Sequence, residues 1–479
     1  MPSRRALLPR SSPGASGVSS RAVLALLDRL ESQSVECHSI MVVRHGHVVA
    51  EGWWSPYSAD RPHLLYSLTK SFTAVAVGIA IGDGLLSLDD RLVDVLPEHV
   101  PADVPEQGRR LTVHHLLSMT TGHDSDSLDA AWALEPADLT KGFLRVPFPE
   151  PEGARHAYDN STTYVLARMV EQVTGTGLPE FLDERLLAPM GIDHAEWDRL
   201  AGGAAFGFHG LHLTTEAVAA FGQLLLRGGR WGDRQLVPRE WVDLATRRHV
   251  GTRQVEGWSE NPDSLCGYGY QFWMSRHGYR GEGSFGQMCL VVPSHDLVVA
   301  LTAGIGQGGE TLLDPVWDHL LPGLDHAEPA DSARDDGALA ERLRNLALSP
   351  PRGTSGPDHV VRARLGACAG SAMPEGTSVV VEPGDGGWTL RLGSVPGIDA
   401  GHRAWRESSP LGRPVVAAGA WQEDTFVADV YVITTPHRIR LEVDTRAGTA
   451  TARWNVVPLT DPRLEPHLRS PLMTRPDVA

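Results

Sequence analysis

One apolar segment constrains the fold of this chain more than any other feature. The run Phe72–Ile81 carries no charge, and it follows directly on Leu65-Tyr-Ser-Leu-Thr-Lys-Ser71. A helix that is apolar on nearly all sides must be buried in the middle of a domain, and this run is too short to span a membrane. We therefore expect a loop that carries Ser67 and Lys70 into the first turn of a central, buried helix.

Ser67 and Lys70 have the spacing of a reactive pair. Residues three apart on a helix share a face, so the hydroxyl and the amine can share a hydrogen bond. Among the 43 basic residues only Lys70 and Lys141 are lysines. A desolvated ammonium can lose its proton whereas a guanidinium cannot, so a lysine here favours a base that activates the serine. The alternative is a capping serine beside a surface lysine, but a lysine in the first turn opposes the helix dipole.

Length and charge limit the classes of function. A chain of 479 residues is long for a single core and suggests two domains. Its formal charge of −16 disfavours nucleic acid and anionic membrane surfaces, because both require a basic face. We therefore expect neither nucleic acid nor a membrane as partner.

The N-terminus and the cysteines bear on the cellular compartment. The opening Met1-Pro-Ser-Arg-Arg-Ala-Leu-Leu8 is similar to a twin-arginine export signal, but the residues after it lack the apolar region of such signals. We expect residues 1–20 to form a disordered tail. The four cysteines show no paired spacing, which suits a reducing compartment and a cytoplasmic location: Cys37, Cys266, Cys289 and Cys368.

The order of strands and helices predicts an α+β domain over residues 21–325. A hairpin that turns at His45-Gly46 lies near its start, and strands near its end cover 268–274, 288–292 and 297–302, with helical patterns in between. We expect an antiparallel sheet built from both ends of the domain and flanked by helices, with an all-helical insert.

The composition changes after this domain. Residues 326–359 are rich in Asp, Glu, Pro and Gly, which indicates a linker with one short helix near 338–348. Short alternating strands follow over residues 360–479 and predict a small β-rich accessory domain. No pattern in this accessory domain suggests chemistry.

Two further segments complete the set of candidate site residues, one with an asparagine and one rich in glycine. Tyr158-Asp-Asn160 precedes an amphipathic helix, so Asn160 or Ser161 is the expected N-cap and Tyr158 lies in the loop before it. Gly281-Glu-Gly-Ser-Phe-Gly-Gln287 leads into a strand, and glycine at a strand edge lets the backbone approach a ligand closely.

A cluster of potential metal ligands does not have the spacing of a metal motif. Neither an HExxH helix nor a binuclear pattern is formed by His114, His115, His123, Asp124 and Asp126. We expect no metal and no other cofactor.

Together these segments resemble the β-lactamase-related serine hydrolases, a family that includes class C β-lactamases, D-Ala-D-Ala carboxypeptidases, esterases and 6-aminohexanoate-oligomer hydrolases. The family pattern is Ser-x-x-Lys, then Tyr-x-Asn, then a Lys-Thr-Gly or His-x-Gly strand. Ser67-Leu-Thr-Lys70, Tyr158-Asp-Asn160 and Ser284-Phe-Gly286 follow this order. The resemblance covers roughly residues 21–325 and implies a β-lactamase/transpeptidase-like fold.

The resemblance implies acyl transfer through a covalent acyl-enzyme on Ser67. Lys70 and Tyr158 would relay the proton, and the sequence leaves open which of them is the base in each step. Asn160 would bind polar groups of the substrate and orient Lys70. The strand segment Ser284, Phe285, Gly286 and Gln287 would line the oxyanion hole, with the N–H of Gln287 as the donor beside that of Ser67.

The third motif departs from the family pattern. Ser284 stands where lactamases carry a cation, and an alternative register places Glu282 there. Without a cation the site would not attract the carboxylate of a β-lactam or a D-alanyl peptide. We therefore expect a small ester or amide as substrate, with weak or no β-lactamase activity.

Two other functions compete with this one. A lipase-like hydrolase is disfavoured, because the chain has no Gly-x-Ser-x-Gly segment. The remaining alternative is a catalytically silent relative that acts as a sensor or scaffold, since the third motif is degenerate.

Overall fold

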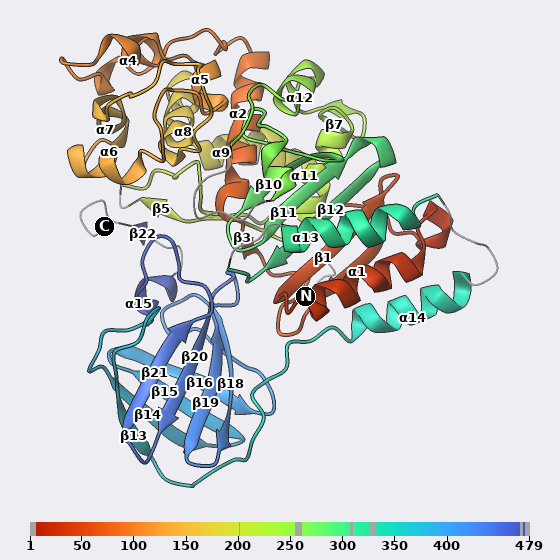
Figure 1. Ribbon diagram of the computed structural model, residues 1–479, viewed down its shortest axis with the longest axis vertical. Helices are drawn as coiled ribbons and strands as arrows, with labels where there is room; N and C mark the ends of the chain where they lie inside the picture. Colours follow the sequence, from red (N-terminus) through yellow and green to blue (C-terminus); the bar gives the residue numbers. More distant parts are fainter. Residues whose placement is uncertain are drawn as a thin grey trace.

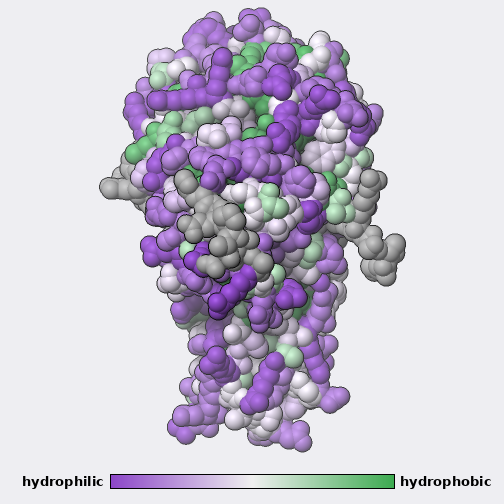
Figure 2. All heavy atoms as spheres, turned by 90° about the vertical axis from the view of Figure 1, so that its right-hand side faces the viewer, coloured by the Kyte–Doolittle hydropathy of each residue, from purple (hydrophilic) through white to green (hydrophobic). Residues whose placement is uncertain are grey.

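The computed structural model describes residues 6–200, 202–253, 261–306, 310–325, 332–469 and 473–474. Figure 1 shows a larger body of helices and sheet, with a β-barrel below it that is formed by the C-terminal part of the chain. The described residues contain no helix that is both long and apolar enough to cross a bilayer. Hydrophilic side chains predominate on the face in Figure 2, over both bodies.

A six-stranded antiparallel sheet forms the centre of the larger body. Its strand order is β2-β1-β12-β11-β10-β9, so strands from both ends of the domain meet in one sheet, as expected. The strands are β1 (Cys37–Arg44), β2 (His47–Trp53), β9 (Trp273–Ser275), β10 (Gly278–Gly283), β11 (Gln287–Val292) and β12 (Leu297–Ala303).

The strand expected over 268–274 is mostly wrong, because β9 begins only at Trp273. The preceding backbone is held in other bonds: Tyr270 N–H donates to Ala245 O at 2.9 Å. Gln271 adopts a left-handed φ of 63°, which a strand does not tolerate.

Helices cover both faces of the sheet (Figure 1). One face packs against α1 (Ser20–Ser32), α13 (Glu310–Pro315) and α14 (Ser332–Arg344). The helical segments between β2 and β9 are α2 (Thr69–Gly82), α3 (Leu92–Val95), α4 (Glu106–Arg110), α5 (Val113–Leu117), α6 (Leu128–Leu134), α7 (Leu139–Arg145), α8 (Asn160–Thr174), α9 (Leu178–Leu182), α10 (Ala188–Met190), α11 (Thr215–Leu226) and α12 (Arg239–Ala245).

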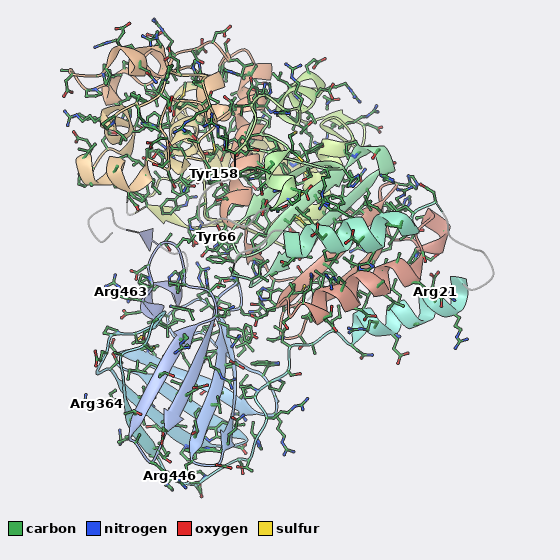
Figure 3. The ribbon with its side chains drawn as sticks, viewed as in Figure 1. Arg21, Tyr66, Tyr158, Arg364, Arg446 and Arg463 are labelled. Carbon is green, nitrogen blue, oxygen red and sulfur yellow. The ribbon has the colours of Figure 1, made fainter. Side chains whose placement is uncertain are left out.

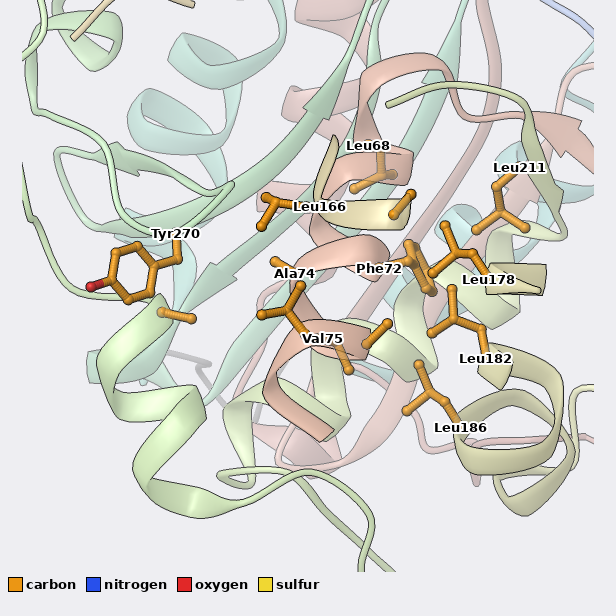
Figure 4. Packing of buried hydrophobic residues seen from close by; sticks show 14 of the residues in the cluster. Leu68, Phe72, Ala74, Val75, Leu166, Leu178, Leu182, Leu186, Leu211 and Tyr270 are labelled. Atoms are coloured by element: carbon orange, nitrogen blue, oxygen red, sulfur yellow. The ribbon is translucent and has the colours of Figure 1, made fainter. Parts of the chain in front are cut away.

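Helix α2 is the predicted central helix. Every residue from Thr69 to Ala80 is buried. Figure 4 shows Phe72 and Val75 among the leucines of neighbouring elements, which include Leu166 of α8 and Leu178 of α9. This packing fixes the start of α2, and with it the turn that carries Ser67.

The C-terminal part of the chain forms a closed barrel. The strands run in the order β16-β15-β14-β13-β21-β20-β19-β18, and β16 also pairs with β18. Their inward side chains fill the interior as an apolar core. The strands are β13 (Val361–Leu365), β14 (Ser378–Gly384), β15 (Gly387–Leu392), β16 (Val395–His402), β18 (Val415–Gln422), β19 (Thr425–Tyr431), β20 (Arg438–Asp444) and β21 (Thr449–Trp454), with β17 (Arg406–Ser408) beside β18.

Two expectations at the domain edges need correction. Within the expected tail, the described residues from Ala6 onward pack on the domain: Ser11 N–H donates to Val48 O at 3.0 Å, and Leu8 is buried. The helix expected inside the linker is α14, and it packs against α1, where Leu339 is buried in the core. A polar, glycine-rich composition therefore did not exclude order where a sheet edge and a helix offered partners.

Candidate active site

Ser67 lies in a tight turn between β3 (His63–Leu64) and α2. A single 3-10 turn, η2 (Tyr66–Leu68), leads from β3 into the helix. Tyr66 has φ 49°, a left-handed conformation that is rare for a bulky side chain. Ser67 itself is partly exposed, whereas Tyr66 and Leu68 on either side are buried. The turn therefore presents one hydroxyl to the surroundings.

Lys70 is held beside this hydroxyl, as the spacing predicted. Its Nζ lies 3.0 Å from Ser67 Oγ, 2.6 Å from Asn160 Oδ1 and 3.3 Å from Phe208 O. The side chain is buried, and burial lowers the pKa of Lys70 to about 7, although the charges of Asp126 and Asp159 act in the opposite direction. At neutral pH a large share of this amine is therefore unprotonated and can accept a proton.

Tyr158 closes over the same pair (Figure 3 labels it above Tyr66). Lys70 Nζ lies 4.8 Å from the centre of the Tyr158 ring, and this ring stacks on Trp273 at 5.7 Å. Burial raises the pKa of Tyr158, while its hydrogen bond with Ser67 lowers it. The net shift is upward, so the phenol keeps its proton at neutral pH.

Asn160 is oriented by a carboxylate. Asp126 accepts from the Asn160 backbone N–H at 3.0 Å and from its side-chain Nδ2 at 2.5 Å. With its nitrogen bound in this way, the amide turns its oxygen toward Lys70. Burial, reinforced by the charge of Asp159, raises the pKa of Asp126 to about 6.

The cap of the helix after Tyr158 differs from the expectation. Asp159, and neither Asn160 nor Ser161, is the N-cap of α8, and it accepts from the Ser161 N–H at 2.9 Å. Asp159 also accepts from the Ser127 hydroxyl at 2.8 Å. This buried carboxylate thus fixes both the helix start and the loop that carries Asp126.

The potential metal ligands have other partners. His114 Nδ1 lies 2.6 Å from the Tyr270 hydroxyl, and His115 Nδ1 accepts from the Thr112 N–H at 3.2 Å in a helix cap. Among the described residues there is no group of three or more His, Cys, Asp or Glu side chains that could hold a metal ion.

The third motif lies at the end of β10. Ser284, Phe285 and Gly286 form the turn between β10 and β11, and Gln287 is the first residue of β11, where its side chain donates to Ala303 O at 2.9 Å. The strand segment against the serine turn is the one just before them. A Cβ atom on Gly283 would overlap the carbonyl oxygen of Leu65 and lie 3.1 Å from Leu68 N.

Glycine is therefore required at position 283, where β10 meets the serine turn. This contact favours the alternative register of the third motif, in which Glu282 stands where lactamases carry a cation. The Glu282 carboxylate accepts from Arg280 Nε at 2.6 Å. Arg280 is almost fully buried and also donates to Met274 O at 2.9 Å. The nearest cation on this strand is thus engaged by protein groups.

Sequence reasoning missed several residues of the site. Trp273 and Phe208 flank Tyr158 and Lys70, and Asp126 was considered only as a metal ligand. These residues come from segments far apart in the chain, and no local spacing signals their contact. Asp126 stands between Asp124 and Asp129, so the sequence carries no signal that singles it out as the partner of the Asn160 amide.

The structure thus brings a serine hydroxyl, a buried amine and a phenol together at the start of a buried helix, beside a glycine-edged strand. The chain belongs to the Beta-lactamase family, whose model matches residues 25–312. This finding confirms the family resemblance seen in the sequence motifs.

Known proteins of several activities are similar to this chain. A 6-aminohexanoate-dimer hydrolase from Paenarthrobacter ureafaciens is 26% identical over 298 residues, which cover 57% of this chain and 74% of that protein. A lovastatin esterase from Penicillium rubens is 26% identical over 253 residues, 41% of this chain and 62% of the esterase. The solved structure of EstCE1, a hydrolase with promiscuous acyltransferase activity, has a TM-score of 0.50 at 18% identity and covers 62% of this chain and 100% of its own. That structural likeness shows a shared fold.

Proposed function

We propose that this protein is a serine hydrolase that cleaves a small ester or amide through an acyl-enzyme on Ser67. The observation that carries the proposal is the 3.0 Å contact between Lys70 Nζ and Ser67 Oγ. At this distance the amine can take the hydroxyl proton as the oxygen attacks a carbonyl carbon. The amide hydrolase and the esterase among the relatives support these two substrate classes.

The opposite pKa shifts of Lys70 and Tyr158 support different roles for them. Lys70, with its pKa lowered to about 7, is the base that accepts the Ser67 proton during acylation. Tyr158 keeps its proton because burial raises its pKa, and it donates to the leaving oxygen or nitrogen. The protonated Lys70 then returns a proton to Tyr158, which restores both groups. In deacylation the attacking water molecule gives a proton to Lys70, and Lys70 passes it to Ser67 Oγ as the bond between that oxygen and the acyl carbon breaks.

Two backbone segments are suited to hold the oxyanion. One is the Ser67 N–H within η2, and the other is the end of β10, whose close approach to Leu65 and Leu68 supports this assignment. We favour a donor at Gly283–Ser284 over the N–H of Gln287, because Gln287 begins the next strand, opposite Gly283. Such donors stabilise the transition state by several kcal/mol, about 3 for a single one.

The charge near the site supports a substrate without a carboxylate. Glu282 lies in the third motif, and Arg280 beside it is bound to Glu282 and to backbone oxygen. A free cation for the carboxylate of a β-lactam is therefore missing from this described strand. Weak or no β-lactamase activity follows from this arrangement.

Hydrolysis of p-nitrophenyl esters by the purified protein and by Ser67→Ala tests the proposal. We expect release of p-nitrophenol by the wild type and a loss of at least about 1,000-fold in Ser67→Ala, since the nucleophile is removed. Equal rates for both proteins would overturn the proposal. No turnover of any ester or amide tested would favour the catalytically silent sensor or scaffold.

A further inference from the structure

The residue before the nucleophile is held by the C-terminal barrel. Tyr66 has a left-handed backbone, which is unfavourable for a tyrosine unless the surroundings impose it. Its hydroxyl donates to Nε2 of His437 at 2.5 Å, across 371 residues of sequence. Figure 3 shows Tyr66 where the larger body meets the barrel.

His437 is built as a fixed acceptor for this bond. Its Nδ1 lies 2.9 Å from Val456 O, so Nδ1 carries the proton and Nε2 is free to accept from the phenol. The side chain is 0% exposed, and burial lowers its pKa well below the ordinary value, which keeps the imidazole neutral. The bond to Val456 and the burial therefore fix both the tautomer and the position of this ring.

The loop that carries His437 also forms a hydrogen bond with the strand before the nucleophile. Leu64 of β3 donates its N–H to Thr434 O at 2.8 Å. The Thr434 hydroxyl in turn accepts from Arg413 at 3.2 Å, and Arg413 donates to Asp198 of the larger body at 2.8 Å. Loop 432–437 is thereby tied to the hydrolase domain at the strand before Tyr66 and, through Arg413, at Asp198.

The same histidine contacts the turn after the third-motif strand. The Phe285 ring lies edge-on to His437 at 5.2 Å and to Tyr66 at 5.0 Å. His437 therefore touches a neighbour of each backbone segment that the proposed mechanism assigns to the oxyanion. A displacement of about 1 Å at such a point can cost roughly 100-fold in rate.

We propose that the C-terminal barrel is an integral part of the active site, and that His437 is a positioning residue that fixes Tyr66 and through it Ser67. This inference rests on the proposed function, because its rate effects require a reactive Ser67. It assigns a role to a domain in which the sequence suggested no chemistry. The His437 side chain acts on the geometry of the serine turn without touching the substrate.

Three variants separate positioning from simple domain docking. His437→Leu removes the acceptor, whereas His437→Gln offers an amide oxygen in its place. Tyr57→Phe is the matched control, since Tyr57 donates its hydroxyl to Thr435 O at 3.1 Å in the same loop but does not adjoin the nucleophile. For each we would measure kcat and KM for a p-nitrophenyl ester, together with the unfolding temperature.

We expect His437→Leu to lower kcat about 10- to 100-fold with KM changed less than about twofold. His437→Gln should recover most of that loss, and Tyr57→Phe should keep kcat within about twofold of the wild type. Wild-type kcat in His437→Leu would overturn the inference. An equal loss in Tyr57→Phe would also overturn it, because docking alone would then explain the effect.

Tyr66→Phe provides a test that leaves the barrel intact, including the case in which His437→Leu fails to fold. It should lose kcat about as much as His437→Leu, and the double variant should be no slower than either single one. Full activity of Tyr66→Phe would contradict the inference. The ¹⁵N resonance of His437 Nε2 should shift between wild type and Tyr66→Phe even if the protein hydrolyses nothing, and an unchanged resonance would exclude the bond. A wild type that hydrolyses no ester would overturn the proposed function, whereas the resonance would still test the bond between Tyr66 and His437.

Discussion

The Asp126 carboxylate accepts two hydrogen bonds from Asn160, one from its backbone N–H at 3.0 Å and one from its side-chain nitrogen at 2.5 Å. These two bonds fix the orientation of the Asn160 amide, so that its oxygen faces Lys70 and lies 2.6 Å from Lys70 Nζ. Asp126 thus acts on the base in two ways, through the orientation of the amide and through its own negative charge. The two effects can be separated by the pH dependence of turnover.

The wild type should lose activity as the pH falls through about 7. Lys70 must be neutral to accept the serine proton, and burial sets its pKa at about 7, so protonation below this value removes the base. We expect kcat/KM for an uncharged ester to rise with pH along an acid limb near pH 7. A profile that is flat between pH 5.5 and 8.5 would exclude Lys70 as the base.

Asp126→Asn should move that limb to lower pH while it slows turnover. Loss of the carboxylate charge removes an interaction that raises the pKa of Lys70. The new amide group would also place a donor opposite Asn160 Nδ2, so the Asn160 amide would rotate by about 180°. Its oxygen would then no longer face Lys70, and we expect kcat to fall about 10-fold. The pH profile of kcat/KM distinguishes this from general damage, since a limb at unchanged pH would contradict the electrostatic link.

Lys70→Arg should abolish turnover although it keeps the positive charge. An arginine cannot give up its proton, so we expect a fall in kcat of about 1,000-fold or more. Lys141→Arg is the control, because the second lysine of the chain pairs with Glu135 at 3.8 Å on the surface and an arginine can keep that pair. Near-normal ester hydrolysis by Lys70→Arg would refute the role of the amine as base.

Ester turnover should exceed nitrocefin turnover by orders of magnitude. Glu282 and its partner Arg280 leave the motif without a cation for the carboxylate of the cephalosporin. Glu282→Gln, which removes the repelling charge, should narrow the ratio of the two kcat/KM values about 10-fold. Comparable rates on both substrates for the wild type would mean that another group binds the carboxylate.

Gly283→Ala should disable the site through the backbone. The added Cβ would overlap Leu65 O, so the serine turn or β10 must move. We expect kcat to fall about 100-fold, with a loss of stability of about 1–3 kcal/mol by chemical denaturation. Gly337→Ala in α14, where a Cβ would meet no atom within 4 Å, should be neutral or slightly stabilising. Wild-type kcat in Gly283→Ala would show that β10 does not shape the oxyanion site.

Part of this arrangement could be predicted because it is local. Ser67 and Lys70 lie three apart at a helix start, and helix geometry alone brings their side chains together. The all-round apolar run after them predicted burial of α2 correctly. The expected hairpin at His45-Gly46 also forms, between β1 and β2.

Other parts depend on contacts that no spacing reveals. The bond from Tyr66 to His437 spans 371 residues, and a histidine at a strand start carries no sequence signal. The segment around Gln271 reads as a strand from its alternation, yet its backbone bonds lie elsewhere. The order of the residues from Ala6 onward likewise depends on partners such as Val48, which composition alone does not show.

Covalent labelling tests the central claim most directly. The wild-type protein would be treated with a fluorophosphonate, digested, and analysed by mass spectrometry for the modified peptide. We predict a single adduct on Ser67, formed much more slowly in Lys70→Arg. No adduct, or one on a different serine, would contradict an amine-activated Ser67 as the nucleophile.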